Sequence, residues 1–311
     1  MPRLTCCLEK LNKFNLHLYY AALFFPLWLN ACQLPATKKK ATFSEISFLV
    51  DLNADSAVFT EDDKKVRTWH STAPGKLQLV FNKRDEGREL AGSGRPSLKE
   101  NVEGINGHHS ISFAQQELLN ENETVFDSLI TGSGFTWIAV LKPYVQAGEL
   151  KDVNSFFGTL KNGGNYEGFW AGFTDDNYLW TGARNGITFG RWDHNNPRIR
   201  TTMPLDTARY YLAAGRMQTG VDKVMVEIFI NDFSTPDAAG VFPVNINANA
   251  SMLSIGQERD AIQHPGVESF RGEIGRFIIY GRPLGDAELR HYGEYLLEYY
   301  NIPSNVRGGL Q

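Results

Sequence analysis

Two stretches of the chain concentrate the side chains that could bind a ligand. Residues 166–194 hold three tryptophans among arginines, aspartates and a histidine, and residues 257–260 read Gln-Glu-Arg-Asp at the exit of a strand. A sugar ring stacks its apolar face on planar aromatic side chains, and its hydroxyls hydrogen-bond to amides, carboxylates and guanidinium groups. The two stretches therefore predict a carbohydrate site, whose expected ligand-binding residues are Trp170, Trp180, Arg184, Arg191, Trp192, His194, Gln257, Glu258 and Arg259.

The same residues also have simpler structural interpretations. Each tryptophan could equally belong to the core of adjacent strands, and residues 257–260 could form a solvated loop. Asp175, Asp176 and Asn177 are most simply a turn, although their oxygens are hard ligands of the kind that calcium prefers. They are fewer than the roughly 6–8 oxygens that calcium usually takes. We therefore expect no required cofactor and keep calcium as the candidate metal.

Short β-strands are the elements that would position these residues. Apolar, aromatic and β-branched runs are separated by Gly, Asn and Asp turns from about Ser44 onward, at the spacing of an antiparallel sandwich. One convincing helix begins at Asp286 and runs to about Tyr300, with an apolar stripe along one side and Pro303 after its end. The expected strands cover 135–144, 155–160, 166–173, 178–182, 187–192, 209–217, 223–230, 251–255 and 276–280.

Composition narrows the class of protein. The 311 residues carry a formal net charge of −4, and 42% of them are hydrophobic and 21% charged, which is typical of a globular chain rather than a disordered one. A mildly acidic chain lacks the basic footprint of a nucleic-acid-binding protein, so no nucleic-acid partner is expected. The 3 cysteines exclude a disulfide framework and a multi-cysteine zinc site.

The first residues predict export. A basic start with Arg3, Lys10 and Lys13 precedes a short apolar run that Pro26 interrupts, which favours a signal peptide over a membrane span. The run ends in Leu-Asn-Ala-Cys32, which resembles a bacterial lipobox; a plain signal peptide with an incidental cysteine is the alternative. We expect a signal peptide over 1–31, lipidation of Cys32, a tether over 32–43 and an outer-membrane lipoprotein that touches the membrane through its lipid anchor alone.

The C-terminal segment 270–288, Phe-Arg-Gly-Glu-Ile-Gly-Arg-Phe-Ile-Ile-Tyr-Gly-Arg-Pro-Leu-Gly-Asp-Ala-Glu, resembles the signature of laminin-G-like, concanavalin-A-like lectin-glucanase jelly-roll domains. Residues 66–69, 94–98, 104–113 and 254–256 are similar to the usual context of that signature. The resemblance implies an all-β, two-sheet antiparallel jelly-roll sandwich with a C-terminal helix over 44–303, followed by a disordered tail over 304–311. Gly275 and Arg276 replace an acidic residue of many relatives, and Gly285 replaces the usual helix-capping Ser.

Binding of a polysaccharide or glycan through the jelly-roll cleft is the leading functional hypothesis for this exported chain. The fold also hosts hydrolases, lyases and adhesion modules, so a polysaccharide lyase or glycoside hydrolase, and an adhesion or structural interaction module, are the alternatives. A lyase needs a neutralised carboxylate and a base, for which Arg191, His194 and Tyr178 are the catalytic candidates. The Glu-x-Asp-x-x-Glu string of the β-glucan-hydrolysing relatives is absent, so no catalytic residue is assigned.

Overall fold

The structure, a computed structural model, describes residues 48–75, 77–83, 92–146, 152–161, 163–250, 252–259, 264 and 266–304. The expected signal peptide, Cys32 and the tether lie outside the described residues, as do Asp260 and residues 305–311. Among the described residues, no helix combines the length and the apolar character that crossing a membrane requires.

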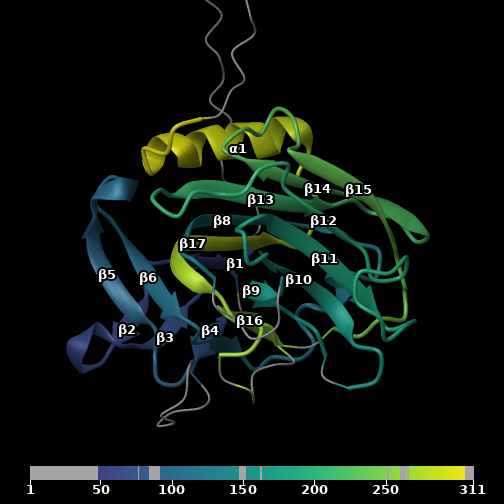
Figure 1. Cartoon of the computed structure of the whole chain (residues 1–311), viewed down its shortest axis with the longest axis horizontal. Coiled ribbons are helices and arrows are strands. Elements are labelled where there is room, and N and C mark those ends of the chain that lie inside the picture. Colours follow the sequence, from purple (N-terminus) through teal and green to yellow (C-terminus); the bar gives the residue numbers. More distant parts are fainter. Residues whose placement is uncertain are drawn as a thin grey trace, which may run out of the picture. The chain divides into compact units, whose positions relative to one another are not determined.

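One sheet has eight strands in the described part of the chain, in the order β15-β14-β13-β8-β17-β6-β5, with β1 also paired to β17 (Figure 1). Neighbouring strands in it are antiparallel. Its strands are β1 (Phe48–Asn53), β5 (Ser97–Val102), β6 (His108–Ala114), β8 (Phe135–Pro143), β13 (Tyr211–Met217), β14 (Lys223–Ile230), β15 (Ala238–Pro243) and β17 (Arg271–Tyr280).

The other sheet has nine described strands, in the order β12-β11-β10-β9-β16-β7-β4-β3-β2, and its pairings are also antiparallel. Its strands are β2 (Val58–Thr60), β3 (Val66–His70), β4 (Val80–Asn82), β7 (Leu118–Asn120), β9 (Asn154–Gly158), β10 (Glu167–Phe173), β11 (Leu179–Asn185), β12 (Arg198–Arg200) and β16 (Leu253–Ile255).

The main hydrophobic core lies between the two sheets. Side chains from both sheets, among them Trp69, Trp137, Phe157 and Phe277, are fully buried in one cluster. Edge-to-face and tilted ring contacts join many of these aromatic side chains, as between Trp137 and Phe157. Two antiparallel sheets around one core, with a helix at the C-terminal end, confirm the expected all-β jelly-roll sandwich.

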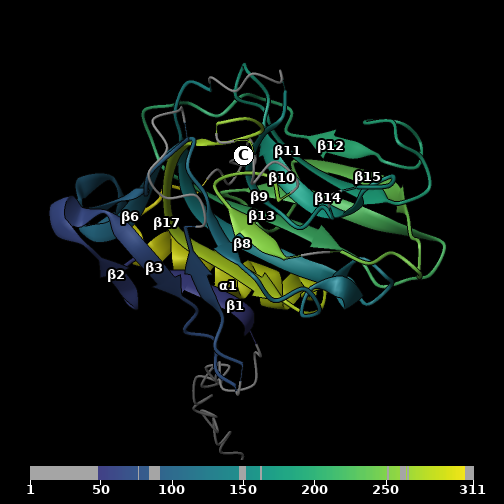
Figure 2. The same ribbon diagram turned by 90° about the horizontal axis from the view of Figure 1, so that it is seen from below.

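The helix α1 (Asp286–Tyr299) covers the outer face of the eight-stranded sheet (Figures 1 and 2). Its apolar stripe, including Leu289 and Leu296, packs with Ile138 and Ile278 in a second buried cluster. The central strands β8, β13 and β17 are therefore buried on both faces, which fits the nearly continuous apolar runs at 137–141, 211–214 and 277–280.

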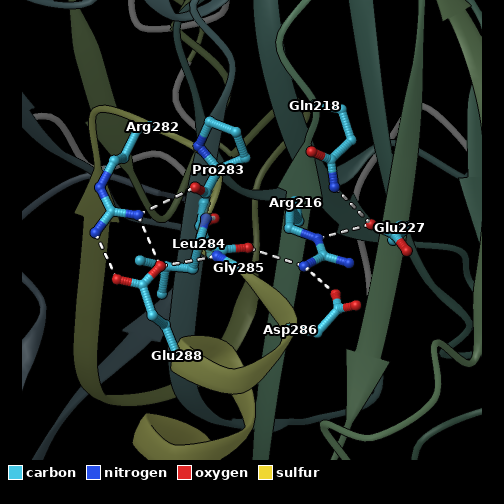
Figure 3. Close-up of polar contacts among 10 residues, drawn as sticks. Arg216, Gln218, Glu227, Arg282, Pro283, Leu284, Gly285, Asp286 and Glu288 are labelled. Atoms are coloured by element: carbon cyan, nitrogen blue, oxygen red, sulfur yellow. Dashed lines mark hydrogen bonds and ion pairs between the residues drawn. The ribbon is translucent and has the colours of Figure 1, made fainter. Parts of the chain in front are cut away.

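The start of α1 is held without a capping hydroxyl (Figure 3). The backbone N–H of Gly285 donates to Glu288 at 2.9 Å, which is half of a capping box. Arg282 donates to both oxygens of the Glu288 carboxylate, at 2.9 and 2.8 Å. These hydrogen bonds hold the pKa of Glu288 at about 2. Arg216 of β13 donates to the carbonyl of Leu284 at 2.8 Å, so the helix start is also tied to the sheet beneath it.

The last two strands of the chain, β16 and β17, are inner strands of the two sheets. β17 lies between β8 and β6 and also pairs with β1, and β16 lies between β9 and β7. Asp51 of β1 accepts two hydrogen bonds from Arg276 of β17, each 2.8 Å long. The expectation that the strand at 276–280 lies buried beside N-terminal strands is confirmed. A chain ending before residue 250 would therefore lack an inner strand of each sheet.

The sequence-based strand assignment is wrong over 187–192, which forms bends rather than a strand. The side-chain amide of Asn196 donates to the carbonyl of Thr188 at 2.9 Å, and such side-chain bonds replace a strand ladder there. In the part of the chain from residue 135 onward, for which strands were expected one by one, two described strands, β12 and β15, were not expected. β12 has only three residues and β15 is rich in alanine and glycine, so neither carries a strong strand pattern.

Candidate functional site

Residues of the 166–194 segment meet on the outer face of the nine-stranded sheet, turned away from the main core. In β10, Phe169, Ala171 and Phe173 belong to that core, so Trp170 points to the opposite side. In β11, Leu179 and Ala183 face the core in the same way, which puts Trp180 and Arg184 on the outer face. The period-two pattern of the two strands thus brings three expected binding residues to one surface.

Glycines make room for the indoles on this face. A Cβ at Gly172 would lie 2.7 Å from an atom of the Trp180 ring. A Cβ at Gly182 would lie 3.1 Å from Nε1 of Trp170 and 3.2 Å from the ring of Trp192. A side chain at either position would therefore crowd the indole rings.

The three tryptophans form one cluster rather than an open platform. Trp192 stacks on Trp170 with ring centroids 5.2 Å apart and planes at 19°, and Trp180 meets both rings edge-on. Trp170 is 1% exposed and Trp180 is fully buried, while Trp192 is half-buried. The expectation that Trp170 and Trp180 stack on a ligand is therefore not met in this conformation, because the 186–197 loop carries Trp192 over them.

A hollow of about 310 Å³ opens beside the tryptophan cluster. Three of the expected binding residues line it, together with five residues that the sequence did not single out for binding. We call it the Arg184–Arg191 pocket; its lining residues are Leu160, Tyr166, Trp170, Arg184, Phe189, Gly190, Arg191 and Glu268.

The open aromatic surface of this pocket comes from Phe189 and Tyr166. Phe189 is 67% exposed, and its ring centroid lies 5.6 Å from that of the half-buried Tyr166. The buried guanidinium of Arg184 lies over the Tyr166 ring at 4.4 Å and donates to the carbonyl of Phe189. Neither ring was predicted to bind a ligand, because both residues were expected in regular strands in which only the tryptophans were taken as binding residues.

One ion pair borders the pocket. Arg191 donates to Glu268 at 3.0 Å, and a third of the Arg191 side chain is exposed. Glu268 comes from the loop after β16, far along the chain from Arg191. The pocket thus combines planar rings, guanidinium groups and a carboxylate, which are the groups that sugar faces and hydroxyls require.

Gln257 and Glu258 lie behind the pocket and are fully buried. Gln257 donates to the carbonyls of His264 and Val267 at 2.8 and 2.7 Å, and Glu258 accepts from the backbone N–H of Leu160 at 3.1 Å. A Cβ at Gly158 would collide with the Glu258 carboxylate. These two side chains therefore hold the loop in place instead of facing a ligand as expected, and Arg259 beside them is half-buried.

The catalytic candidates are not gathered into one constellation. His194 is exposed on the 186–197 loop, while the Tyr178 ring lies under Arg200 at 4.6 Å. Within the described residues, no hydrogen bond, ion pair or ring contact joins His194, Arg191 and Tyr178. A base and a charge-neutralising group must both reach the same substrate atoms, and this arrangement does not place them together.

Asp175, Asp176 and Asn177 form a tight turn. Asp175 accepts from the side-chain amide of Asn154 at 3.2 Å, and the hydroxyl of Thr174 donates to Asp176. Asn177 has the left-handed φ of 64° that such turns favour. Among the described residues, no group of three or more His, Cys, Asp or Glu side chains could hold a metal. Calcium binding stays a prediction of the sequence.

A larger hollow of about 400 Å³ lies between residues 201–211 and 230–237. Arg209 at its rim donates to the hydroxyl of Tyr211 at 2.8 Å, and Asp237 accepts from the backbone and hydroxyl of Thr202. Its one aromatic ring, Tyr211, is only 2% exposed. A sugar face finds no open ring there, so the Arg184–Arg191 pocket is the better candidate for a carbohydrate site despite its smaller volume.

Comparison with known proteins gives distant structural similarity only. No protein-family model matches the chain, and no curated protein matches it. One similar structure is the sialidase module CBM40 of Ruminococcus gnavus, solved with α2,3 sialyllactose. It is 14% identical to this chain with a TM-score of 0.43, and the match covers 63% of this chain and 97% of the module. The binding domain of botulinum neurotoxin serotype D/C has 11% identity and a TM-score of 0.45, over 80% of this chain and 52% of that chain.

A third similar structure is a Trypanosoma rangeli sialidase, with 12% identity and a TM-score of 0.47 over 83% of this chain and 33% of that chain. Similarity this distant carries no argument about what the present chain binds. The class of protein is set by the chain's own structure, which is a jelly-roll β-sandwich with an aromatic and arginine-lined pocket on one sheet.

Proposed function

We propose that this chain binds a polysaccharide or another glycan in the Arg184–Arg191 pocket. One observation carries the proposal: the exposed Phe189 ring and the Tyr166 ring stand beside Arg191 and Glu268 around a hollow of about 310 Å³. The exposed Phe189 ring offers a planar apolar surface on which the apolar face of a sugar ring can stack. The neighbouring charged groups then receive the hydroxyls at the edge of that ring.

The resemblance of residues 270–288 to laminin-G-like, concanavalin-A-like domains supports the same proposal. That resemblance concerns the fold, and the fold hosts several activities, so the pocket rather than the fold carries the argument. The alternatives of a lyase, a hydrolase and an adhesion module stay predictions, because no described cluster of side chains favours one of them.

Replacement of Phe189 by alanine is expected to weaken glycan binding by about fivefold and to leave the melting temperature unchanged. The loss corresponds to a stacking contribution of about 1 kcal/mol, and an exposed ring adds little to the stability of the fold. Depletion of the full chain from solution by a panel of insoluble polysaccharides measures the binding.

Phe59→Ala is the matched control, because Phe59 is 52% exposed on β2 at the opposite end of the same sheet. The proposal requires this variant to bind like the native chain. Native binding by Phe189→Ala, together with lost binding by Arg209→Gln, would move the site to the larger hollow.

We further propose export and lipid anchoring through Cys32, which rest on the sequence of residues 1–33 alone. Cys32→Ala is expected to move the exported chain from the membrane fraction to the soluble fraction, because the acyl chains would be the membrane contact. Cell fractionation with a radiolabelled fatty acid measures both location and lipidation. Unchanged membrane association of the variant would contradict the anchor.

A further inference from the structure

We infer that the ligand of this surface is an acidic polysaccharide, held along β12 by Arg198 and Arg200, in a row of three arginines that begins at the buried Arg184 of β11. The inference rests on the proposed glycan binding and adds the charge of the ligand and the direction in which it lies.

Strand register places the three arginines in a row. Arg198 and Arg200 of β12 pair with Gly182 and Trp180 of β11, and paired residues project to the same face of a sheet. Arg184 lies two residues beyond Gly182 on β11, so all three arginines stand on the outer face. Each step of two residues spans about 7 Å along the strand. The row therefore extends from the Arg184–Arg191 pocket along β11 and β12, which are neighbouring strands of the sheet.

Each arginine of the row lies over an aromatic ring. The guanidinium carbon is 4.4 Å from the Tyr166 ring centroid for Arg184, 4.4 Å from Trp192 for Arg198 and 4.6 Å from Tyr178 for Arg200. A guanidinium that stacks through its face keeps its N–H donors in its own plane. Stacking thus fixes the orientation of the cations. Arg184 is buried and donates to the carbonyl of Phe189, so the donors that can meet carboxylate or sulfate oxygens are those of Arg198 and Arg200.

The two arginines of β12 are poorly neutralised by the protein itself. The Arg198 guanidinium lies 3.8 Å from the Asp152 carboxylate and donates to the backbone carbonyl of Asp152 at 3.5 Å, and Arg200 forms no ion pair with any described residue. Two other acidic residues of this segment already accept hydrogen bonds: Asp193 from Thr188, Asn195 and Asn196 of its own loop, and Asp175 from Asn154 of β9. Burial and the neighbouring Arg200 lower the pKa of Arg198. Bound anions would relieve the repulsion between the two cations.

The spacing favours a polymer over a single acidic sugar. Arginines whose backbones are about 7 Å apart along a strand present successive cations to anions repeated along a polymer, whereas one carboxylate can satisfy one or two of them. The chain as a whole is acidic, with a net charge of −4. The arginine row is therefore a local basic patch rather than part of a general basic surface.

The experiment measures the affinity of the full chain for four soluble polymers. Polygalacturonate carries carboxylates, dextran sulfate carries sulfates, dextran is neutral, and poly-glutamate is an anion without sugar. We expect tight binding of at least one acidic polysaccharide, weaker binding of dextran and poly-glutamate, and affinity that falls as salt rises, because exposed charges are screened over about 10 Å at 0.1 M salt. The acidic polymer that binds more tightly identifies carboxylate or sulfate as the anion.

Arg200→Gln is expected to weaken binding of the acidic polysaccharide about tenfold, and Arg198→Gln with Arg200→Gln about a hundredfold, with dextran binding unchanged. Arg67→Gln is the matched control, since Arg67 is exposed on β3 at the far end of the same sheet, and it should leave every affinity unchanged. Arg200 is exposed, so its single variant keeps the test valid should the double variant unfold.

Three results would overturn the inference. Equal affinity for dextran and the acidic polymers, unaffected by the arginine variants, would leave glycan binding intact but remove the preference for acid. Equal affinity for poly-glutamate and the acidic polysaccharides would reduce the row to a general anion surface. Binding of none of the polysaccharides would reject the proposed function together with the inference.

Discussion

Replacement of Glu273 by alanine is expected to lower the free energy of unfolding by about 3 kcal/mol. The Glu273 carboxylate is almost fully buried on the outer face of the eight-stranded sheet, and removing one partner of such a buried network leaves the others unsatisfied. The partners belong to separate parts of the chain. Lys99 and Ser110 donate to it at 2.8 Å each, and the hydroxyls of Tyr144 and Tyr210 also donate to it. Chemical denaturation at pH 7 measures the loss.

The same network predicts how stability depends on pH. Burial alone would raise the pKa of Glu273, but hydrogen bonds from Lys99, Tyr144, Tyr210 and Ser110 outweigh it and hold the pKa at about 2. An unfolded glutamate has a pKa of about 4.3. The stabilisation is therefore complete above about pH 4.5 and is lost as the pH falls toward 2. Glu273→Gln, which cannot ionise, should flatten the stability profile across that window.

Glu100→Gln is the matched control for both measurements. Glu100 lies on β5 beside Lys99 and pairs with Lys64 at 2.7 Å, but both side chains are well exposed. Exposed ion pairs contribute little to stability, so this variant should stay close to the native chain at pH 7. Equal losses for Glu273→Ala and Glu100→Gln would show that the buried network contributes no more than a surface pair.

Strand alternation explains how much of the site could be predicted from the sequence. In β10, the apolar residues at 169, 171 and 173 point to the core, so the residue between them, Trp170, must face outward. That pattern is local and visible in the sequence. The convergence of Trp170 and Trp180 on one surface follows from it once the two strands pair, and the structure pairs them.

Features that depend on distant or irregular contacts could not be read in the same way. Ile187–Trp192 has the composition of a strand, yet hydrogen bonds from the Asn196 side chain fold it into a loop that places Trp192 over Trp170. Gln257 and Glu258 have the composition of a solvated loop, yet their partners are backbone groups such as the N–H of Leu160, almost a hundred residues away. Polar composition indicates hydrogen-bonding capacity and leaves the partner undetermined.

Trp170→Ala is expected to lower the free energy of unfolding by about 3–5 kcal/mol, the range for removing a large aromatic side chain from a packed interior. Trp170 is 1% exposed and touches the rings of both Trp180 and Trp192, so its removal leaves a cavity under the 186–197 loop. Phe189→Ala, on the rim of the same pocket, should change stability by less than about 0.5 kcal/mol. Urea denaturation of the two variants separates a structural indole from a ligand-facing ring. Native stability of Trp170→Ala together with loss of its glycan binding would contradict the buried cluster. That result would mean that Trp192 moves aside and that the sugar stacks on Trp170 in its place.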